Sequence, residues 1–271
     1  MSRKNFFVAD EAALKNYQDH LKDISFIQCN LYAQFETTEE FLREVLPPCF
    51  EMPDKPLVDV YIGKWLWDIP GCDHFDIASI LLSCKYKGVE GSYQLELYLE
   101  DGMAVALGRE VWGEGKKVGI TQMFHYGKDI YAYCERNGQR IIEIEAELGE
   151  DMGPVDNEGY GFELKAQPHG QGYGFQHDPQ VVMFHAKLHN RVYKEGTGVI
   201  RFNSSKYDRL DTIPVVKMVK TYYLEGKKYG EVLSVDDLTD GAEKYMPTYF
   251  AQKYDLPDDY FVVSFYDNDK E

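Results

Sequence analysis

Alternating hydrophobic and polar residues along much of the chain predict a protein built mainly from β-strands. The clearest example is segment 26–36, where apolar side chains occupy every second position and polar ones the positions between them. This pattern is typical of a strand with one buried face and one wet or functional face. Further strands are predicted at residues 57–65, 77–86, 93–100, 103–109, 129–135, 140–147, 159–165, 181–189, 198–202 and 215–224.

Two dipeptides predict tight hairpins between neighbouring strands. Asp101-Gly102 separates segments 93–100 and 103–109, and Asn137-Gly138 separates the next pair of strands. Asp-Gly and Asn-Gly both favour the type I′ turns that match the twist of antiparallel strands. The chain therefore predicts antiparallel neighbours in the sheet.

A short helix is expected directly after the first strand. Thr37 with Glu40 three residues later has the pattern of a capping box, and Pro47-Pro48 would end the helix. Many short strands and few helices favour a mainly β (α+β) fold, either a sheet or a barrel, with peripheral helices.

Composition and charge narrow the classes of partner. With 271 residues, the chain can bury a full core and is read as one domain, 1–271. Its 46 acidic and 29 basic residues give a net charge of −17, and no Lys/Arg-rich block is present. We therefore expect no nucleic-acid partner and no binding to an anionic membrane.

Compartment signals favour a cytoplasmic protein. The apolar residues near the N-terminus are too few for a signal-peptide core, and the apolar stretch 77–84 is too short to span a bilayer. Five cysteines without a Cys-x-x-Cys spacing argue against a disulfide framework and a thiolate zinc site. His185 and His189 have zinc-pair spacing, but their surroundings read as a strand, so no metal is expected.

The segment 108–119 carries the strongest candidate chemistry, because Lys116 and Lys117 adjoin each other in a glycine-rich turn. Such a pair is commonly two solvated side chains. Burial and a second ammonium, however, both favour the neutral amine, which is the nucleophile needed to attack a carbonyl group.

A longer sequence pattern favours the interpretation that the lysine pair is reactive. Segment 88–119 contains Gly-Val-Glu-Gly-Ser-Tyr, Leu-Tyr-Leu-Glu-Asp, Ala-Val-Ala-Leu-Gly-Arg-Glu and Lys-Lys-Val-Gly in order. It resembles the acetoacetate decarboxylase family without a gap, and weaker resemblance covers most of the chain. The resemblance implies a cone-shaped antiparallel β-barrel with the reactive lysine inside and no cofactor.

The family likeness also assigns roles to residues of this turn. By position, Lys116 matches the lysine that forms a Schiff base with the substrate, and Lys117 matches the neighbour credited with tuning its pKa. Arg109 and Glu110 fall in the matching Gly-Arg-Glu and are expected to brace the turn as an ion pair, more than to act in catalysis.

Four positions depart from the family pattern. Glu114 and Gly115 stand where the family commonly has an aromatic residue and a proline. Glu114 must point away from Lys116, or this lysine is less acidic than in the family. The family's pocket arginine falls at Gln28, and its partner glutamate falls at Ile77, beside Asp76. The pair that handles a substrate carboxylate is thus missing.

The resemblance predicts a lyase that breaks a carbon–carbon bond in a β-keto acid or a related carbonyl compound through a lysine Schiff base. Two alternatives stay open: aldolase-dehydratase or cyclising chemistry from the same imine, and a barrel that binds carbonyl compounds without catalysis. A homo-oligomer is also expected. The aromatic-rich segment 240–271 extends past the matched part and is expected to pack on the barrel or on a second subunit.

Overall fold

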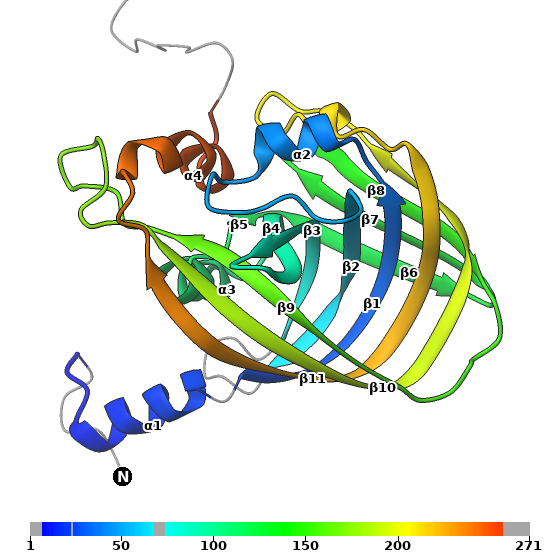
Figure 1. The fold of residues 1–271 in the computed structure, drawn as a ribbon. Coiled ribbons are helices and arrows are strands. Elements are labelled where there is room, and N and C mark those ends of the chain that lie inside the picture. The colour runs from blue at the N-terminus through cyan, green and yellow to red at the C-terminus, as the bar shows by residue number, and fades with distance from the viewer. Residues whose placement is uncertain (1–6, 23, 68–73, 257–271) are drawn as a thin grey trace, which may run out of the picture.

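One large β-sheet dominates the computed structural model, which describes residues 7–22, 24–67 and 74–256 (Figure 1). Its strands are β1 (Ile24–Glu36), β2 (Leu57–Trp67), β3 (His74–Tyr86), β4 (Val89–Leu99), β5 (Lys116–Val118), β6 (Ile120–Tyr126), β7 (Asp129–Arg136), β8 (Gln139–Leu148), β9 (Val155–Lys165), β10 (Gln180–Phe202) and β11 (Lys217–Asp237). The helices are α1 (Glu11–Lys22), α2 (Glu39–Val45), α3 (Gly102–Leu107), η1 (Gly108–Trp112), η2 (Leu210–Thr212), η3 (Ala242–Tyr245) and α4 (Met246–Lys253).

Seven strands close into a barrel in the order β11-β1-β2-β3-β4-β9-β10, because β10 also pairs with β11. All pairs around the ring are antiparallel except β4 with β9, where Ser92 and Tyr93 pair with Gly161 and Phe162 in parallel. The expected antiparallel barrel with peripheral helices is confirmed, with this single parallel exception.

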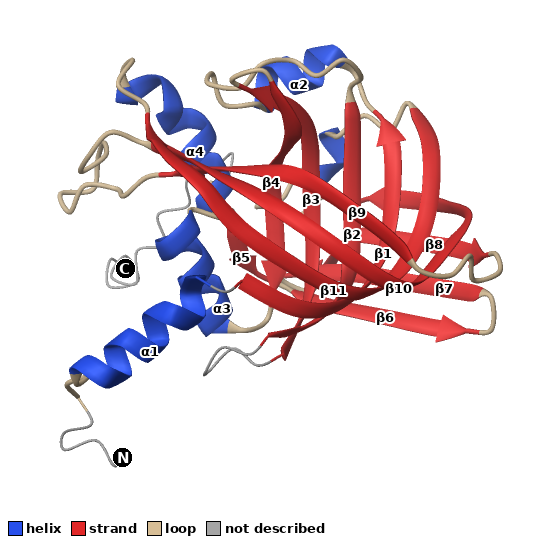
Figure 2. Ribbon diagram, turned by 60° about the horizontal axis from the view of Figure 1, so that its bottom comes forward, coloured by secondary structure: helices blue, strands red, loops and turns tan. Residues whose placement is uncertain are grey.

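A second layer, β6–β8, branches from the far half of β10 and covers one side of the barrel wall (Figure 2). Alternation decides what lies between the two layers: Leu31, Val60 and Ile80 point outward from the barrel and share a core with Ile130 and Ile142 of the second layer. The intervening positions of the same strands face into the barrel, where aromatic rings surround a cavity.

The predicted strand at 103–109 is wrong, because this segment forms α3 and then the π-helical turn η1. Asp101 does not begin a hairpin; its Oδ1 accepts a hydrogen bond from the backbone N–H of Ala104 at 2.7 Å and caps α3. Ala104 and Leu107 are the buried residues of α3, at helical spacing. The Asp-Gly dipeptide thus serves as a helix start.

Other boundaries shift more modestly. The helix after β1 begins one residue later than expected, with Thr38 as its N-cap. The segments predicted at 181–189 and 198–202 are one continuous strand, β10. Strand β6 and helix α1 were not predicted, although Leu14, Tyr17 and Leu21 of α1 have helical spacing; Tyr17 and Leu21 pack, partly buried, against the inner apolar cluster.

The C-terminal segment packs on the barrel through α4. Tyr245 and Tyr249 are buried, and the Tyr249 hydroxyl donates to the carbonyl of Ala166 at 2.8 Å. The prediction that this segment packs on the barrel is confirmed for residues 240–256. Tyr260, Phe261 and Tyr266, on which the prediction also relied, lie outside the described residues.

Candidate active site

The turn before β5 is shaped by two glycines. Gly113 adopts φ +81° after the π-helical turn, a conformation that favours glycine, and directs the chain back toward β5. At Gly108, a Cβ atom would lie 2.1 Å from Glu114 Oε2 and 2.5 Å from Lys116 Nζ. Only glycine at position 108 therefore leaves room for both side chains.

Lys116 is buried at the cavity wall, with 3% of its surface exposed. Its Nζ lies 2.7 Å from Glu114 Oε2 and donates to the carbonyl of Ala104 at 3.2 Å. Glu114 therefore points toward the lysine, not away from it as a reactive amine was expected to require. Its carboxylate forms an ion pair with the amine and is placed to exchange a proton with it.

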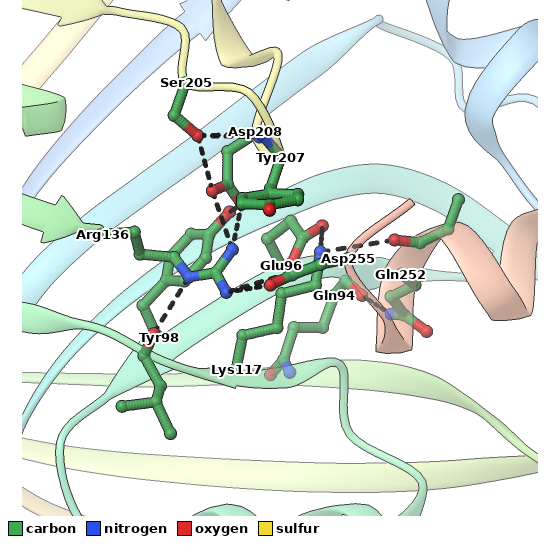
Figure 3. Close-up of polar contacts among 12 residues, drawn as sticks. Gln94, Glu96, Tyr98, Lys117, Arg136, Ser205, Tyr207, Asp208, Gln252 and Asp255 are labelled. Atoms are coloured by element: carbon green, nitrogen blue, oxygen red, sulfur yellow. Dashed lines mark hydrogen bonds and ion pairs between the residues drawn. The ribbon is translucent and has the colours of Figure 1, made fainter. Parts of the chain in front are cut away.

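Lys117 points to the opposite side of β5, as successive strand residues do. Its Nζ lies 2.9 Å from Glu96 Oε1 and donates to the Ala251 carbonyl of α4 at 3.3 Å (Figure 3). Neighbouring Arg136 binds Asp208 at 2.6 Å and Asp255 at 3.0 Å. Lys117 thus belongs to a buried ionic cluster under the C-terminal segment, and it does not line the cavity.

The cavity inside the barrel has a volume of about 580 Å³. Aromatic side chains form most of one wall, including Phe26, Trp65 and Trp112, and Trp112 packs against Trp67 with 5.6 Å between ring centroids. Cavities of about 300–1,000 Å³ accommodate drug-sized ligands. The site therefore favours an organic molecule with a large apolar part.

Glu163 of β9 brings a second carboxyl group into the cavity lining. It is 5% exposed, and no group among the described residues forms a hydrogen bond with its Oε2. Burial raises the pKa of Glu163 well above its usual range, and the charge of Glu114 adds to this shift. Glu163 is thereby a neutral acid that can donate a proton inside the barrel.

Lys253 of α4 is a further buried amine close to the turn. Its Nζ donates to the Gly113 carbonyl, and burial lowers its pKa to about 7. Lys253 does not line the cavity. An amine with this pKa is nevertheless substantially neutral at physiological pH, so Lys253 is the chemical rival of Lys116.

Three residues expected in the pocket through the family match are not among those that line the cavity. Gln28 is buried on the same face of β1 as Phe26 and Tyr32; its Oε1 accepts from Asn30 at 3.0 Å, and its Nε2 has no hydrogen-bond partner among the described residues. Asp76 pairs with Lys64 at 3.1 Å, and Ile77 is fully buried in the apolar core. Strand alternation places Gln28 and Ile77 on the inward faces of β1 and β3, where neighbouring side chains cover them, whereas Asp76 is on the outward face of β3.

Arg109 and Glu110 also lie outside the cavity, beside a depression shared with Tyr254. The Arg109 guanidinium stacks over the Tyr254 ring at 5.0 Å, whereas Glu110 is exposed. Within the described part of the chain they form no ion pair with each other, so the expected brace across the turn is wrong. The π-helical turn sends their side chains outward, opposite to buried Trp112.

Sequence reasoning missed Glu163, Lys253 and Lys228 of β11, which also lines the cavity. Barrel closure brings Glu163 and Lys228 to Lys116 from distant parts of the sequence. The one local signal was an acidic residue between Phe162 and Leu164 in a strand-like segment. Among the described residues, no group of His, Cys, Asp and Glu side chains is arranged to hold a metal ion.

Comparison with known families agrees with this architecture. Residues 23–237 match the model of the acetoacetate decarboxylase (ADC) family, and the chain belongs to that family. Its likeness to curated relatives is local: it is 34% identical over 96 residues to acetoacetate decarboxylase 3 of Mesorhizobium japonicum, which covers 35% of this chain and 37% of that protein. An acetoacetate decarboxylase of Paraburkholderia phytofirmans is 34% identical over 88 residues, covering 32% and 34%. The matches span about a third of these relatives.

Solved structures share the fold over a longer range. The acetoacetate decarboxylase of Legionella pneumophila superposes with a TM-score of 0.66 at 18% identity, covering 78% of this chain and 87% of that one. The enduracididine biosynthesis enzyme MppR, complexed with pyruvate, gives a TM-score of 0.66 at 15% identity, covering 78% and 90%. At these identities the likeness establishes the barrel fold.

Proposed function

We propose that the protein is a carbon–carbon lyase in which Lys116 forms a Schiff base with a β-keto acid or related carbonyl compound. The observation that carries this proposal is the position of Lys116: its buried amine opens on an aromatic cavity, next to a carboxylate that can take its proton. Membership of the acetoacetate decarboxylase family supports the same chemistry.

In the proposed reaction, Glu114 accepts a proton from the Lys116 ammonium, and the neutral amine adds to the ketone carbonyl. Glu114 returns that proton to the departing hydroxyl, which leaves as water, so that a protonated imine remains. The bond to the carboxylate carbon then breaks and releases carbon dioxide. Its electron pair passes into the imine and gives a neutral enamine.

Glu163 is suited to the next step, because its pKa is raised well above the usual range by burial and it therefore carries a proton. It donates this proton to the carbon that lost carbon dioxide, and the imine forms again. Water then hydrolyses the imine to release the ketone and free Lys116, and Glu163 regains a proton from solvent.

The cavity favours a substrate larger than acetoacetate, since its volume and aromatic walls suit a bulky apolar group. The same space supports a second candidate, aldol-type condensation or cyclisation, in which the enamine attacks a second carbonyl group. MppR gives this candidate a precedent in the same fold, because one structure holds the condensation product of pyruvate and imidazole 4-carboxaldehyde.

Product analysis tests the proposal. Purified protein is incubated with benzoylacetate, an aromatic β-keto acid, and separately with acetoacetate, and carbon dioxide and ketone are measured. We expect carbon dioxide and acetophenone from benzoylacetate and little from acetoacetate. Acetone production at about ten turnovers per second, the usual enzymatic range, would contradict the size preference. Condensation products without carbon dioxide would favour the second candidate.

A homo-oligomer and a cytoplasmic location remain part of the proposal. No helix within the described ranges is long and apolar enough to cross a membrane. The proposal includes no metal and no cofactor, because the lysine imine itself accepts the electron pair.

A further inference from the structure

Within the described part of the chain, two lysines that line the cavity, Lys220 and Lys228, have no carboxylate within ion-pair distance. Lys228 of β11 lines the cavity, opposite Phe26 of β1 in the barrel register. Its Nζ lies 5.3 Å from the centroid of the Phe26 ring and 5.2 Å from that of Trp65. Across the described residues, no carboxylate lies within ion-pair distance of this ammonium; two aromatic faces contact it, and Glu114 and Glu163 act on it electrostatically.

The other titratable groups that line the cavity have different electrostatic partners. Lys116 is paired with Glu114, and Glu163 carries a proton. Lys220 lies 4.5 Å from the Tyr222 ring, and the charge that acts on it is that of Asp59. Glu114 and Glu163, the carboxyl groups beside Lys116, act on Lys228. Lys228 is therefore the cavity cation better placed to bind the carboxylate of a substrate held at Lys116.

Burial lowers the pKa of Lys228, and Glu114 and Glu163 oppose this shift only from a distance. An anion in contact with the ammonium would favour the charged form more strongly, so that anion binding and protonation of Lys228 support each other. Contact with two aromatic rings further stabilises the cation without satisfying its three hydrogen-bond donors. The site thus offers a directional hydrogen bond to an incoming anion.

We propose that Lys228 is the specificity-determining residue that binds the substrate carboxylate, in place of the arginine that the family match would put at Gln28. This inference rests on the proposed function and names its substrate class: monoanionic carboxylates with an aromatic or apolar body. The apolar body lies against Phe26 and Trp65, and the carboxylate accepts hydrogen bonds from Lys228 Nζ.

Binding of a carboxylate that lacks a carbonyl group to react tests this inference without any imine. Hydrocinnamate, an aromatic carboxylate, and hydrocinnamamide, its neutral amide, are titrated into the full-length protein by calorimetry. We expect Lys228→Met to weaken hydrocinnamate binding by about tenfold to a hundredfold, the loss of a charge-assisted hydrogen bond. Amide binding should be unchanged, and Lys228→Arg should retain most of the affinity for hydrocinnamate.

The matched control is Lys227→Met, because Lys227 is the exposed neighbour on the same strand, over the outer Tyr229 ring. It should leave both ligands unaffected. The inference would be overturned if Lys228→Met lost the same affinity for the acid and for the amide. It would also be overturned if Lys228→Met and wild type bound the acid equally well. Carboxylate binding through Lys228 in a protein that never traps an imine would instead contradict the proposed function alone.

Discussion

At the scale of single residues, the proposed chemistry depends on two carboxyl groups with different environments. Glu114 lies 2.7 Å from the Lys116 amine and is partly exposed, whereas Glu163 is buried without a hydrogen-bond partner for its Oε2 among the described residues. Two carboxyl groups in such different environments can have different roles, one accepting a proton and the other donating one. The barrel thereby supplies both proton transfers without a cofactor.

The raised pKa of Glu163 predicts a pH-dependent stability. Above about pH 4.3 the Glu163 carboxyl group loses its proton in the unfolded chain but keeps it in the folded protein. The stabilising contribution is therefore complete below that pH and is lost as the pH rises toward the raised native pKa. Relative to Glu163→Gln, wild type should become less stable as the pH rises above about 4.3, measured by urea unfolding.

The control for this prediction is Glu147→Gln, because Glu147 is exposed on β8. Its stability difference from wild type should stay constant with pH. If the difference in free energy of unfolding between wild type and Glu163→Gln also stayed constant with pH, Glu163 would not be the proton donor of the proposed mechanism.

The family resemblance over segment 88–119 singled out Lys116, because the lysine pair alone is commonly two solvated side chains. It could not give the direction of Glu114, since this depends on the π-helical turn and on the space left by Gly108. Nor could it find Lys228, whose neighbours come from other strands. The unsupported pocket positions, Gln28 and Ile77, rested on alignment alone.

At the scale of elements, strand alternation in β5 directs its two lysine side chains to opposite faces. Lys116 faces the cavity, and Lys117 faces the ionic cluster that holds α4 in place (Figure 3). Burial raises the pKa of Glu96 to about 7, even though Lys117 lies beside it. Because Lys117 pairs with Glu96 and donates to the Ala251 carbonyl of α4, we expect it to act mainly by anchoring the C-terminal segment.

Removal of one partner from this buried pair should destabilise the fold. Lys117→Met leaves Glu96 buried without its cation and should lower the free energy of unfolding by about 3 to 5 kcal/mol. The double change Lys117→Met with Glu96→Met should recover much of the loss, because both polar groups are then removed. Urea unfolding measures both effects, with imine formation followed in parallel.

A tuning role for Lys117 predicts the opposite pattern. Lys117→Met would then keep its stability but shift the pH profile of imine formation, because the positive charge near Lys116 would be gone. The ion pair with Glu96 neutralises that charge in the structure, which is why we expect anchoring to dominate.

Elements with a strong alternating pattern, such as β1, were predictable from sequence. The helix at 102–107 was not, because Asp-Gly can begin a hairpin or cap a helix, and the tertiary packing of the next residues decides between the two. The long strand β10 appeared as two pieces because residues 190–197 include polar and glycine residues on its exposed stretch.

At the scale of the whole molecule, barrel closure creates the site. Strand β10 pairs with both β9 and β11, which brings Glu163 and Lys228 to the cavity that Lys116 enters from β5. Periodicity could predict an antiparallel sheet or barrel, and the family resemblance predicted the barrel. The contents of the cavity could not be predicted, because they depend on the register between distant strands.

The central claim is that Lys116 is the amine that forms the imine. Borohydride reduction with benzoylacetate, followed by peptide mass spectrometry, tests it most directly. Lys253 makes the test discriminating, since its pKa of about 7 gives it a neutral amine close by. We predict one adduct, on the peptide that contains Lys116, and none in a folded Lys116→Arg variant. An adduct on Lys253 or Lys228, or one that persists at full stoichiometry in Lys116→Arg, would contradict the account.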